Sequence, residues 1–301
     1  MAVNQSPDPI IIFGAPRSGT TYLQSILNQH PEVFISHEAR LFGWLHQSFK
    51  VISNQDSFLV THREEFIEHL RVSYPQLIRN FYSKLKPQAR YWGDKNPLSL
   101  TKANVGTLQT IVELFPGAKF IHIIRDGRDV VASLTRRLHS NGEPWADFLT
   151  AHVLWNGHIE RGMAFGRTQA AEKYFELRYE DLIRDDLGVA GKLFQFLEIS
   201  MVDSVARFCE SEQEQRTPFS LPTRDISNVA ASDWSKVFDA DQQCRSLKLI
   251  GANLIACGYE TAPTLAAKLE KSSMKGGAHG RTPLALGGRQ NARQTALDYP
   301  Q

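Results

Sequence analysis

A short apolar run that leads directly into a glycine-rich loop constrains the fold of this chain most. Residues 10–13 read Ile-Ile-Ile-Phe, and Gly14-Ala-Pro-Arg-Ser-Gly-Thr-Thr21 follows at once. The apolar, mostly β-branched run predicts a buried strand, and apolar residues at helical spacing predict a helix over 20–28. Strand, glycine loop and helix in this order are typical of an α/β protein that binds an anion at the helix N-terminus.

The rest of the chain continues this alternation. We expect further strands at 119–124 and 174–178, and helices at 101–115, 129–138, 148–165, 187–197, 203–212 and 241–257. Strands separated by helices predict a central parallel β-sheet that is flanked by helices on both faces. The stretch 41–86 is mostly helical and rich in aromatic residues, so we expect a helical insertion there. It is a candidate wall of a substrate pocket, although aromatics at helical spacing more often form core.

Length and composition favour one catalytic domain. The chain has 301 residues, of which 42% are hydrophobic, which supports a sizeable buried core over residues 1–271. The stretch 272–301 is rich in glycine and has few apolar residues in any period, so we expect a flexible tail. The sequence leaves the oligomeric state open.

The charge balance excludes a general nucleic-acid binder. The 34 Lys and Arg residues exceed the 32 Asp and Glu residues by two, so any anion site must be local. The first residues lack a basic leader, and their short apolar run predicts no membrane span. The three cysteines form no CxxC pair, which argues against a structural zinc or disulfide framework and favours a cytoplasmic location.

The first motif, Gly14 to Thr21, has the glycine spacing of a Walker A loop but carries Thr20 in place of the lysine. That change weighs against an ATPase or GTPase, because the lysine contacts the terminal phosphates there. The loop still offers consecutive backbone N–H groups, hydroxyls and the Arg17 guanidinium. An ordinary glycine-rich turn is the alternative interpretation.

The second motif places Arg125 at the end of the strand at 119–124 and Ser133 on the helix that follows. Ligands of open α/β sheets bind at the carboxyl ends of the strands, so both residues are candidates for one anion. The alternative is that Arg125 pairs with Asp126 or Asp129 across a surface turn.

Two further segments carry candidate catalytic groups. In Trp92-Gly-Asp-Lys95-Asn-Pro97, the lysine offers a compact cation for charge that develops on an oxygen, although a plain surface lysine is the alternative. Residues 30–40 are expected to form a second strand next to the first. There Glu38, oriented by Arg40, is a candidate proton acceptor, with a Glu38–Arg40 surface pair or His37 as the base as alternatives.

Together these segments resemble the sulfotransferases that use 3′-phosphoadenosine 5′-phosphosulfate (PAPS), most closely the tyrosylprotein and heparan sulfate branch. The resemblance covers roughly residues 10–260 and implies the P-loop NTPase-like sulfotransferase fold. It implies that the phosphosulfate is held by Pro16, Arg17, Ser18, Gly19, Thr20 and Thr21, and that the 3′-phosphate is held by Arg125 and Ser133. The Arg178-Tyr-Glu-Asp-Leu182 segment is similar to a family turn near the nucleotide, which makes Tyr179 a candidate contact.

The resemblance also implies the chemistry. Glu38 is the expected general base, and Lys95 and Arg17 are expected to stabilise the transferred sulfuryl group and the leaving phosphate, so that PAPS yields 3′-phosphoadenosine 5′-phosphate (PAP) without a metal. The acceptor carries a hydroxyl: a sugar, lipid, polyketide, phenol or tyrosine. For the loop that closes over the nucleotide the weak candidates are Arg224, Asn228, Trp234 and Lys236. The rival hypotheses are a non-catalytic nucleotide-binding protein of the same fold and a P-loop kinase.

Overall fold

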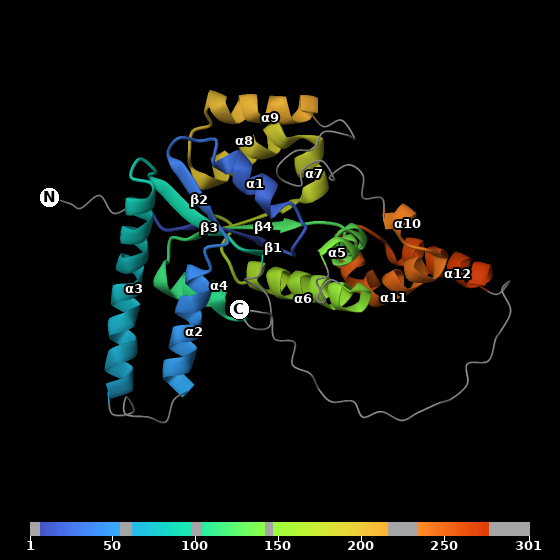
Figure 1. Cartoon of the computed structure of the whole chain (residues 1–301), viewed down its shortest axis with the longest axis horizontal. Helices are drawn as coiled ribbons and strands as arrows, with labels where there is room; N and C mark the ends of the chain where they lie inside the picture. Colours follow the sequence, from blue (N-terminus) through green and yellow to red (C-terminus); the bar gives the residue numbers. More distant parts are fainter. Residues whose placement is uncertain (1–6, 55–61, 98–103, 142–146, 216–233, 277–301) are drawn as a thin grey trace.

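Strand β1 (Ile10–Gly14) lies in the middle of a parallel sheet. The computed structural model describes residues 7–54, 62–97, 104–141, 147–215 and 234–276. Within these ranges the sheet has the order β2-β3-β1-β4-β5 and every pairing is parallel (Figure 1). The other strands are β2 (Val33–His37), β3 (Tyr91–Lys95), β4 (Lys119–Ile124) and β5 (Tyr174–Arg178). The predicted central parallel sheet is thus confirmed.

The strand order corrects one prediction. Residues 33–37 do form a strand, but β3 lies between it and β1, so the two are not neighbours. Gly93 permits the close approach of β3 to β1, because an added Cβ would lie 1.8 Å from the Ile10 carbonyl oxygen. Local periodicity carries no information about which strands pair, which is why the order was missed.

Helices cover both faces of the sheet, as predicted. The described helices are α1 (Thr20–Leu27), α2 (Leu41–Asn54), α3 (Arg63–Leu85), α4 (Thr107–Leu114), α5 (Gly127–Asn141), α6 (Phe148–Gly166), α7 (Tyr179–Arg184), α8 (Asp186–Leu197), α9 (Asp203–Gln215), α10 (Trp234–Val237), α11 (Ala240–Ala256) and α12 (Ala262–Gly276). In Figure 1, α1, α8 and α9 lie above the sheet, and α4 and α6 lie below it.

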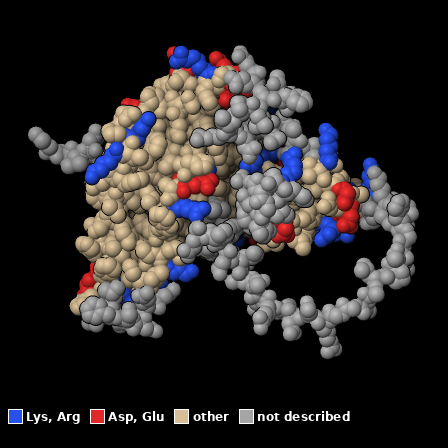
Figure 2. Space-filling view, in the orientation of Figure 1, with Lys and Arg blue, Asp and Glu red and all other residues tan. Residues whose placement is uncertain are grey.

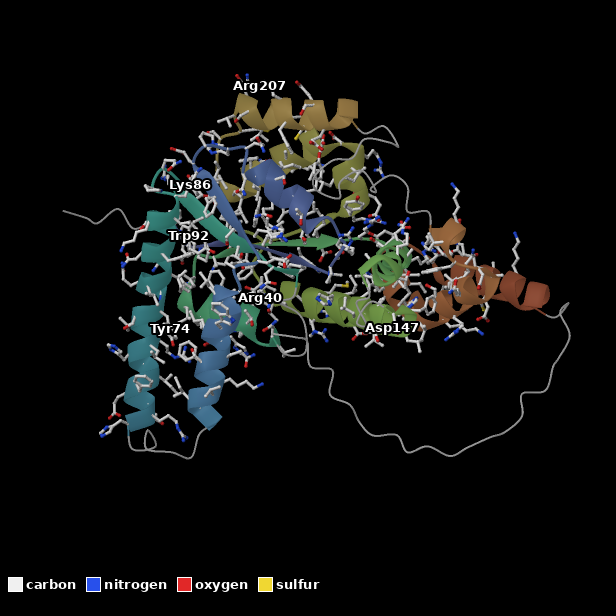
Figure 3. The ribbon with its side chains drawn as sticks, in the orientation of Figure 1. Arg40, Tyr74, Lys86, Trp92, Asp147 and Arg207 are labelled. Carbon is white, nitrogen blue, oxygen red and sulfur yellow. The ribbon has the colours of Figure 1, made fainter. Side chains whose placement is uncertain are left out.

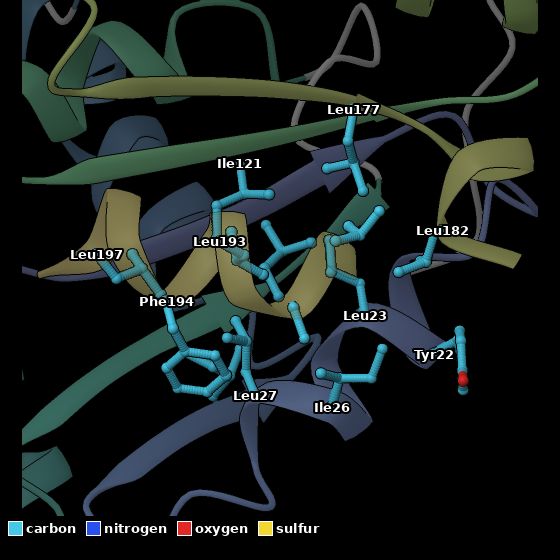
Figure 4. Packing of buried hydrophobic residues seen from close by; sticks show 14 of the residues in the cluster. Tyr22, Leu23, Ile26, Leu27, Ile121, Leu177, Leu182, Leu193, Phe194 and Leu197 are labelled. Carbon is cyan, nitrogen blue, oxygen red and sulfur yellow. The ribbon is translucent and has the colours of Figure 1, made fainter. Parts of the chain in front are cut away.

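Alternating side chains of β1 face two different cores. Ile10 and Ile12 pack in a cluster with α1, α8 and α9, whereas Ile11 and Phe13 pack against α2, α3 and α4 on the other face. The first cluster includes Leu23, Ile26 and Leu27, the apolar positions that predicted helix α1 (Figure 4). Full burial of each such side chain contributes about 1.5–3 kcal/mol, so this packing fixes the start of α1 against the sheet.

The predicted helical insertion consists of α2 and α3, which project together from one end of the sheet (Figure 1). Its aromatic residues divide between core and surface. Phe42 and Tyr82 are buried in the core, and the ring of Tyr74, between α2 and α3, meets Phe49 edge-on (Figure 3). Trp44 is 66% exposed. Several of these aromatic residues therefore build core, the alternative that the sequence left open.

The carboxyl-terminal part differs from the expected boundaries. Helix α12 packs on α11 and continues to Gly276, so positions 272–276 of the predicted tail are helical. Positions 277–301 lie outside the described residues. The start of one earlier helix also differs from its prediction. Helix α4 begins at Thr107 rather than at 101, because Gly106 precedes it with φ +97°. Positions 98–103 lie outside the described residues.

Candidate active site

The predicted phosphate loop connects β1 to α1 at the carboxyl edge of the sheet. The backbone turns sharply, with a hydrogen bond from the Ser18 N–H to the Ala15 carbonyl (3.1 Å) and positive φ at Arg17 (+71°) and Gly19 (+91°). Helix α1 then starts at Thr20, and no side chain in the described ranges caps it, so its first N–H groups can bind an anion. The buried Pro16 and Thr20 and the half-buried Thr21 complete the loop.

Ser18 offers the loop a buried hydroxyl that can bind an anion. Its side chain is fully buried, and its Oγ has no hydrogen-bond partner within the described part of the chain. A buried hydroxyl without a partner is costly, so an incoming phosphate or sulfate oxygen would gain from this donor. The donor set of this loop therefore fits the phosphosulfate that the sequence suggested.

The second loop meets the first directly. Arg17 Nε donates to Ser133 Oγ at 3.0 Å, and Arg125 Nη1 donates to the Arg17 carbonyl at 2.9 Å. Helix α5 starts at Gly127, which places Ser133 in its second turn. The structure thus brings together the cations and hydroxyls of two loops that are more than a hundred residues apart.

Tyr179 joins these two loops. It is buried, and its ring lies beneath the Arg125 guanidinium, with 4.3 Å between Cζ and the ring centroid. The same ring fills the space beside Gly19, where an added Cβ would lie 2.4 Å from Cδ2 of the tyrosine. Glycine at position 19 is therefore required both by its φ and by this ring.

Two of the candidate catalytic residues, Glu38 and Lys95, meet at the ends of β2 and β3. Lys95 is the last residue of β3, is 1% exposed, and its Nζ donates to Glu38 Oε1 at 2.7 Å. Burial lowers the pKa of Lys95, and the hydrogen bond that Lys95 donates to Glu38 opposes that shift. In the sheet register Lys95 pairs with Ile12 of β1, two residues before the phosphate loop begins.

Glu38 is not oriented as the sequence predicted. Strand β2 ends at His37, and Glu38 and Arg40 have φ of +53° and +57°, so the alternation of an extended segment does not apply to them. Lys95 rather than Arg40 is the ion-pair partner of Glu38, and Arg40 lies exposed where the chain enters α2 (Figure 3). The predicted Glu38–Arg40 relation is therefore wrong.

The side chains of His37 and Glu38, the two candidate bases, lie next to each other. His37 Nε2 lies 3.9 Å from Glu38 Oε1, because the left-handed turn at Glu38 brings the two side chains together. The other ring nitrogen, Nδ1, faces Gln24 Oε1 at 3.0 Å. Since Gln24 Nε2 donates to the Ile35 carbonyl, its Oε1 is the acceptor, and Nδ1 of His37 carries a hydrogen.

A buried carboxyl behind this pair was missed by sequence reasoning. Asp94 Oδ1 accepts from the Ala39 N–H at 3.0 Å and from Ser36 Oγ at 2.8 Å, which holds the turn that carries Glu38. Ser36 also contacts the Tyr82 hydroxyl at 2.6 Å. Burial raises the pKa of Asp94, and these hydrogen bonds oppose that shift. Its position next to Lys95 in β3 was the available signal.

The loop around Arg125 is buried and is not a surface turn, although Arg125 and Asp129 lie close enough to interact electrostatically. Asp126 pairs with Arg128 (2.6 Å), and Asp129 Oδ1 accepts from the Trp234 N–H (3.1 Å). Burial, with Asp126 nearby, raises the pKa of Asp129 to about 6. Of the weak closing-loop candidates, Trp234 and Lys236 lie in α10, and Arg224 and Asn228 fall outside the described residues.

Among the described residues, no helix is long and apolar enough to cross a membrane. In the same ranges, no group of three or more His, Cys, Asp or Glu residues could hold a metal ion. On the face in Figure 2, basic and acidic side chains form small, interspersed groups.

The chain is similar in sequence to known proteins. A family model described as "Sulfotransferase family" matches residues 9–204. Protein-tyrosine sulfotransferase of Drosophila melanogaster is 27% identical over 205 residues, which cover 67% of this chain and 40% of that protein. The chain thus spans less than half the length of this relative.

Two solved structures share the fold. The sulfotransferase domain of the Synechococcus PCC 7002 olefin synthase superposes with a TM-score of 0.54 at 21% identity, covering 83% of this chain and 96% of that one. A mouse sulfotransferase complexed with PAP superposes with a TM-score of 0.51 at 15% identity, covering 89% of each chain.

Proposed function

Because the chain belongs to the sulfotransferase family, we propose that it transfers the sulfuryl group of PAPS to a hydroxyl of an acceptor and releases PAP. The observation that carries this proposal is the contact between the two loops. Arg17 reaches Ser133, and Arg125 reaches the backbone of Arg17, so one continuous site presents two guanidinium groups and several hydroxyls. A nucleotide with anionic groups at both its 5′ and 3′ positions matches such a site.

The residues divide into two anion sites in this proposal. The phosphate loop, with the buried Ser18 hydroxyl and the first N–H groups of α1, holds the 5′-phosphosulfate. Arg125 and Ser133 hold the 3′-phosphate, and Tyr179 supports the Arg125 guanidinium from below. The PAP in the mouse neighbour supports this choice of nucleotide.

The mechanism is an in-line displacement at sulfur. Glu38 takes the proton of the acceptor hydroxyl while the acceptor oxygen forms a bond to sulfur. The bond between sulfur and the bridging phosphate oxygen breaks, and the electron pair stays on PAP. Lys95 and Arg17 stabilise the negative charge that grows on that oxygen, and each such donor is typically worth about 3–4 kcal/mol in the transition state.

The Glu38–Lys95 ion pair supports these roles. It places the base beside the cation that serves the leaving group, both at the carboxyl edge of the sheet where the phosphate loop begins. No bound metal takes part in this proposal, because side-chain cations stand where Mg²⁺ stands in kinases. The acceptor class is a hydroxyl compound. The curated relative acts on protein tyrosine, as its name says, which makes tyrosyl peptides one group to assay.

The experiment has two stages. Thermal shift with PAP, AMP and ATP tests the nucleotide, because a ligand at a hundred times its Kd adds about 2.7 kcal/mol of stability. Stabilisation by PAP well beyond that by AMP or ATP is expected, and preferential stabilisation by ATP would overturn the proposal in favour of a kinase. Transfer of label from ³⁵S-PAPS to a panel of phenols, sugars, lipid alcohols and tyrosyl peptides then tests catalysis. A protein that binds PAP but labels none of these acceptors would support the non-catalytic alternative.

A further inference from the structure

Hydrogen bonds from the carboxyl-terminal part of the chain hold the loop that carries Arg125. The Glu180 carboxylate forms a bridge: Oε1 accepts from the Asp126 N–H at 3.0 Å, and Oε2 accepts from the Tyr259 hydroxyl at 2.7 Å. Tyr259 follows helix α11 and lies beyond residues 9–204, which the family model matches. An element outside the family match is therefore linked through Glu180 to Asp126, the residue next to Arg125.

Tyr259 is well placed to hold this bridge. The Arg178 guanidinium lies over its ring, with 4.1 Å between Cζ and the ring centroid, so the tyrosine contacts the β5–α7 turn twice. Burial, and then the Glu180 carboxylate, raise the pKa of Tyr259, so its hydroxyl stays protonated and donates. A hydrogen bond to an ionised carboxylate is stronger than one between neutral groups.

Residues next to Tyr259 and Arg125 make further contacts that hold the same loop. Glu260 pairs with Arg128, which is buried and also holds Asp126 through two nitrogens. On the other side, Trp155 Nε1 donates to the Arg125 carbonyl at 3.1 Å. The main chain of Arg125 and Asp126 is thus held from α6, from α7 and from the segment between α11 and α12.

We propose that Tyr259 is a positioning residue for the 3′-phosphate site, acting through Glu180 on the main chain beside Arg125. This inference rests on the proposed function, because it presupposes that Arg125 binds the 3′-phosphate. Glu180, fixed by the Tyr259 hydroxyl, accepts the hydrogen bond of the Asp126 N–H. The fixed main chain at Asp126 in turn keeps the Arg125 side chain over Tyr179 and against the Arg17 backbone. Removing the tyrosine hydroxyl leaves Glu180 with one of its two hydrogen-bond partners. Arg125 is then less preorganised, so it contributes less to the free energy of binding an anion.

The test is Tyr259→Phe, which keeps the ring over which Arg178 lies and removes only the hydroxyl. Calorimetry should show PAP affinity lowered roughly threefold to tenfold, with AMP affinity within about twofold of wild type, because AMP lacks the 3′-phosphate. The matched control is Tyr82→Phe, which removes a buried hydroxyl bonded to Ser36 at 2.6 Å, away from both anion loops. Its ratio of PAP to AMP affinity should equal that of wild type.

A double variant separates positioning from general stability. In an Arg125→Ala background, Tyr259→Phe should leave PAP affinity unchanged, because the group it positions is gone. A lowered Tm with an unchanged PAP-to-AMP ratio, or an additive loss in the double variant, would overturn the inference. A wild-type protein without preference for PAP would instead overturn the proposed function itself, so the two failures are distinguishable.

Discussion

Lys95 Nζ lies 2.7 Å from Glu38 Oε1, and this ion pair joins the carboxyl ends of β3 and β2. The lysine is 1% exposed, whereas the glutamate side chain is 31% exposed. The cation is thus held inside the protein, and the carboxylate at its tip remains open to an incoming hydroxyl. Breaking such a pair on one side leaves a buried charge uncompensated, so each partner supports the function of the other.

Glu38→Gln keeps the shape of the side chain and removes the proton acceptor. We expect turnover to fall about 10²–10⁴-fold, the usual contribution of a general base, while PAP affinity changes little. His37→Ala serves as the comparison, because the histidine side chain is 59% exposed and sits beside the same carboxylate. Steady-state kinetics of both variants show which of the two residues is the general base. A dead histidine variant with an active glutamine variant would reverse the assignment of the base.

The pH dependence of turnover should report the ionisation of Lys95. Its pKa is lowered from the usual value mainly by burial, so the ammonium loses its proton at a pH below that of an exposed lysine. Since the charged form stabilises the leaving oxygen, kcat should decline on the alkaline side as pH rises through that lowered pKa. Lys95→Met should lower kcat by about 10²–10³-fold and lack this alkaline limb. An unchanged limb in the variant would exclude Lys95 as its source.

Arg125→Ala tests the second anion loop. The variant should lose most of the preference for PAP over AMP, because its guanidinium is assigned to the 3′-phosphate, and AMP affinity should stay close to wild type. Isothermal titration with both nucleotides measures the difference. If the variant loses affinity for PAP and AMP equally, Arg125 supports the loop rather than the phosphate.

Gly19→Ala tests the packing between the two loops. An added Cβ would lie 2.4 Å from the Tyr179 ring at a φ of +91°, so we expect a loss of about 2–4 kcal/mol of stability together with weaker PAP binding. Gly191→Ala in helix α8 is the control, because its Cβ would meet nothing within 4 Å. That change should stabilise the protein by up to about 1 kcal/mol. Denaturant unfolding and calorimetry check both; equal stability of the two variants would contradict the packing argument.

Chelation tests the assignment of charge neutralisation to Arg17 and Lys95. We expect EDTA to leave most of the turnover intact, because both cations belong to the protein. Sulfuryl transfer measured before and after exhaustive dialysis against the chelator is sufficient. Complete loss that Mg²⁺ restores would favour a kinase-like mechanism, and it would require a different account of the leaving-group charge.

The sequence alone determined the elements that carry the site. The apolar run of β1, the glycine spacing of the phosphate loop and the helical spacing of Leu23, Ile26 and Leu27 are local patterns, and each formed as predicted. The same holds for Arg125 at the end of β4 and Ser133 on the next helix. Such patterns can be predicted from the sequence, because steric and hydrophobic preferences act within a few residues.

Only the tertiary structure decided how these pieces meet. The order of β2, β3 and β1, the pairing of Glu38 with Lys95 rather than Arg40, and the bridge from Tyr259 through Glu180 to Asp126 all join distant parts of the chain. These contacts depend on strand register, on a left-handed turn at Glu38, and on which buried polar groups find partners. Each is settled by the free energy of the whole packed core, which no short window of sequence contains.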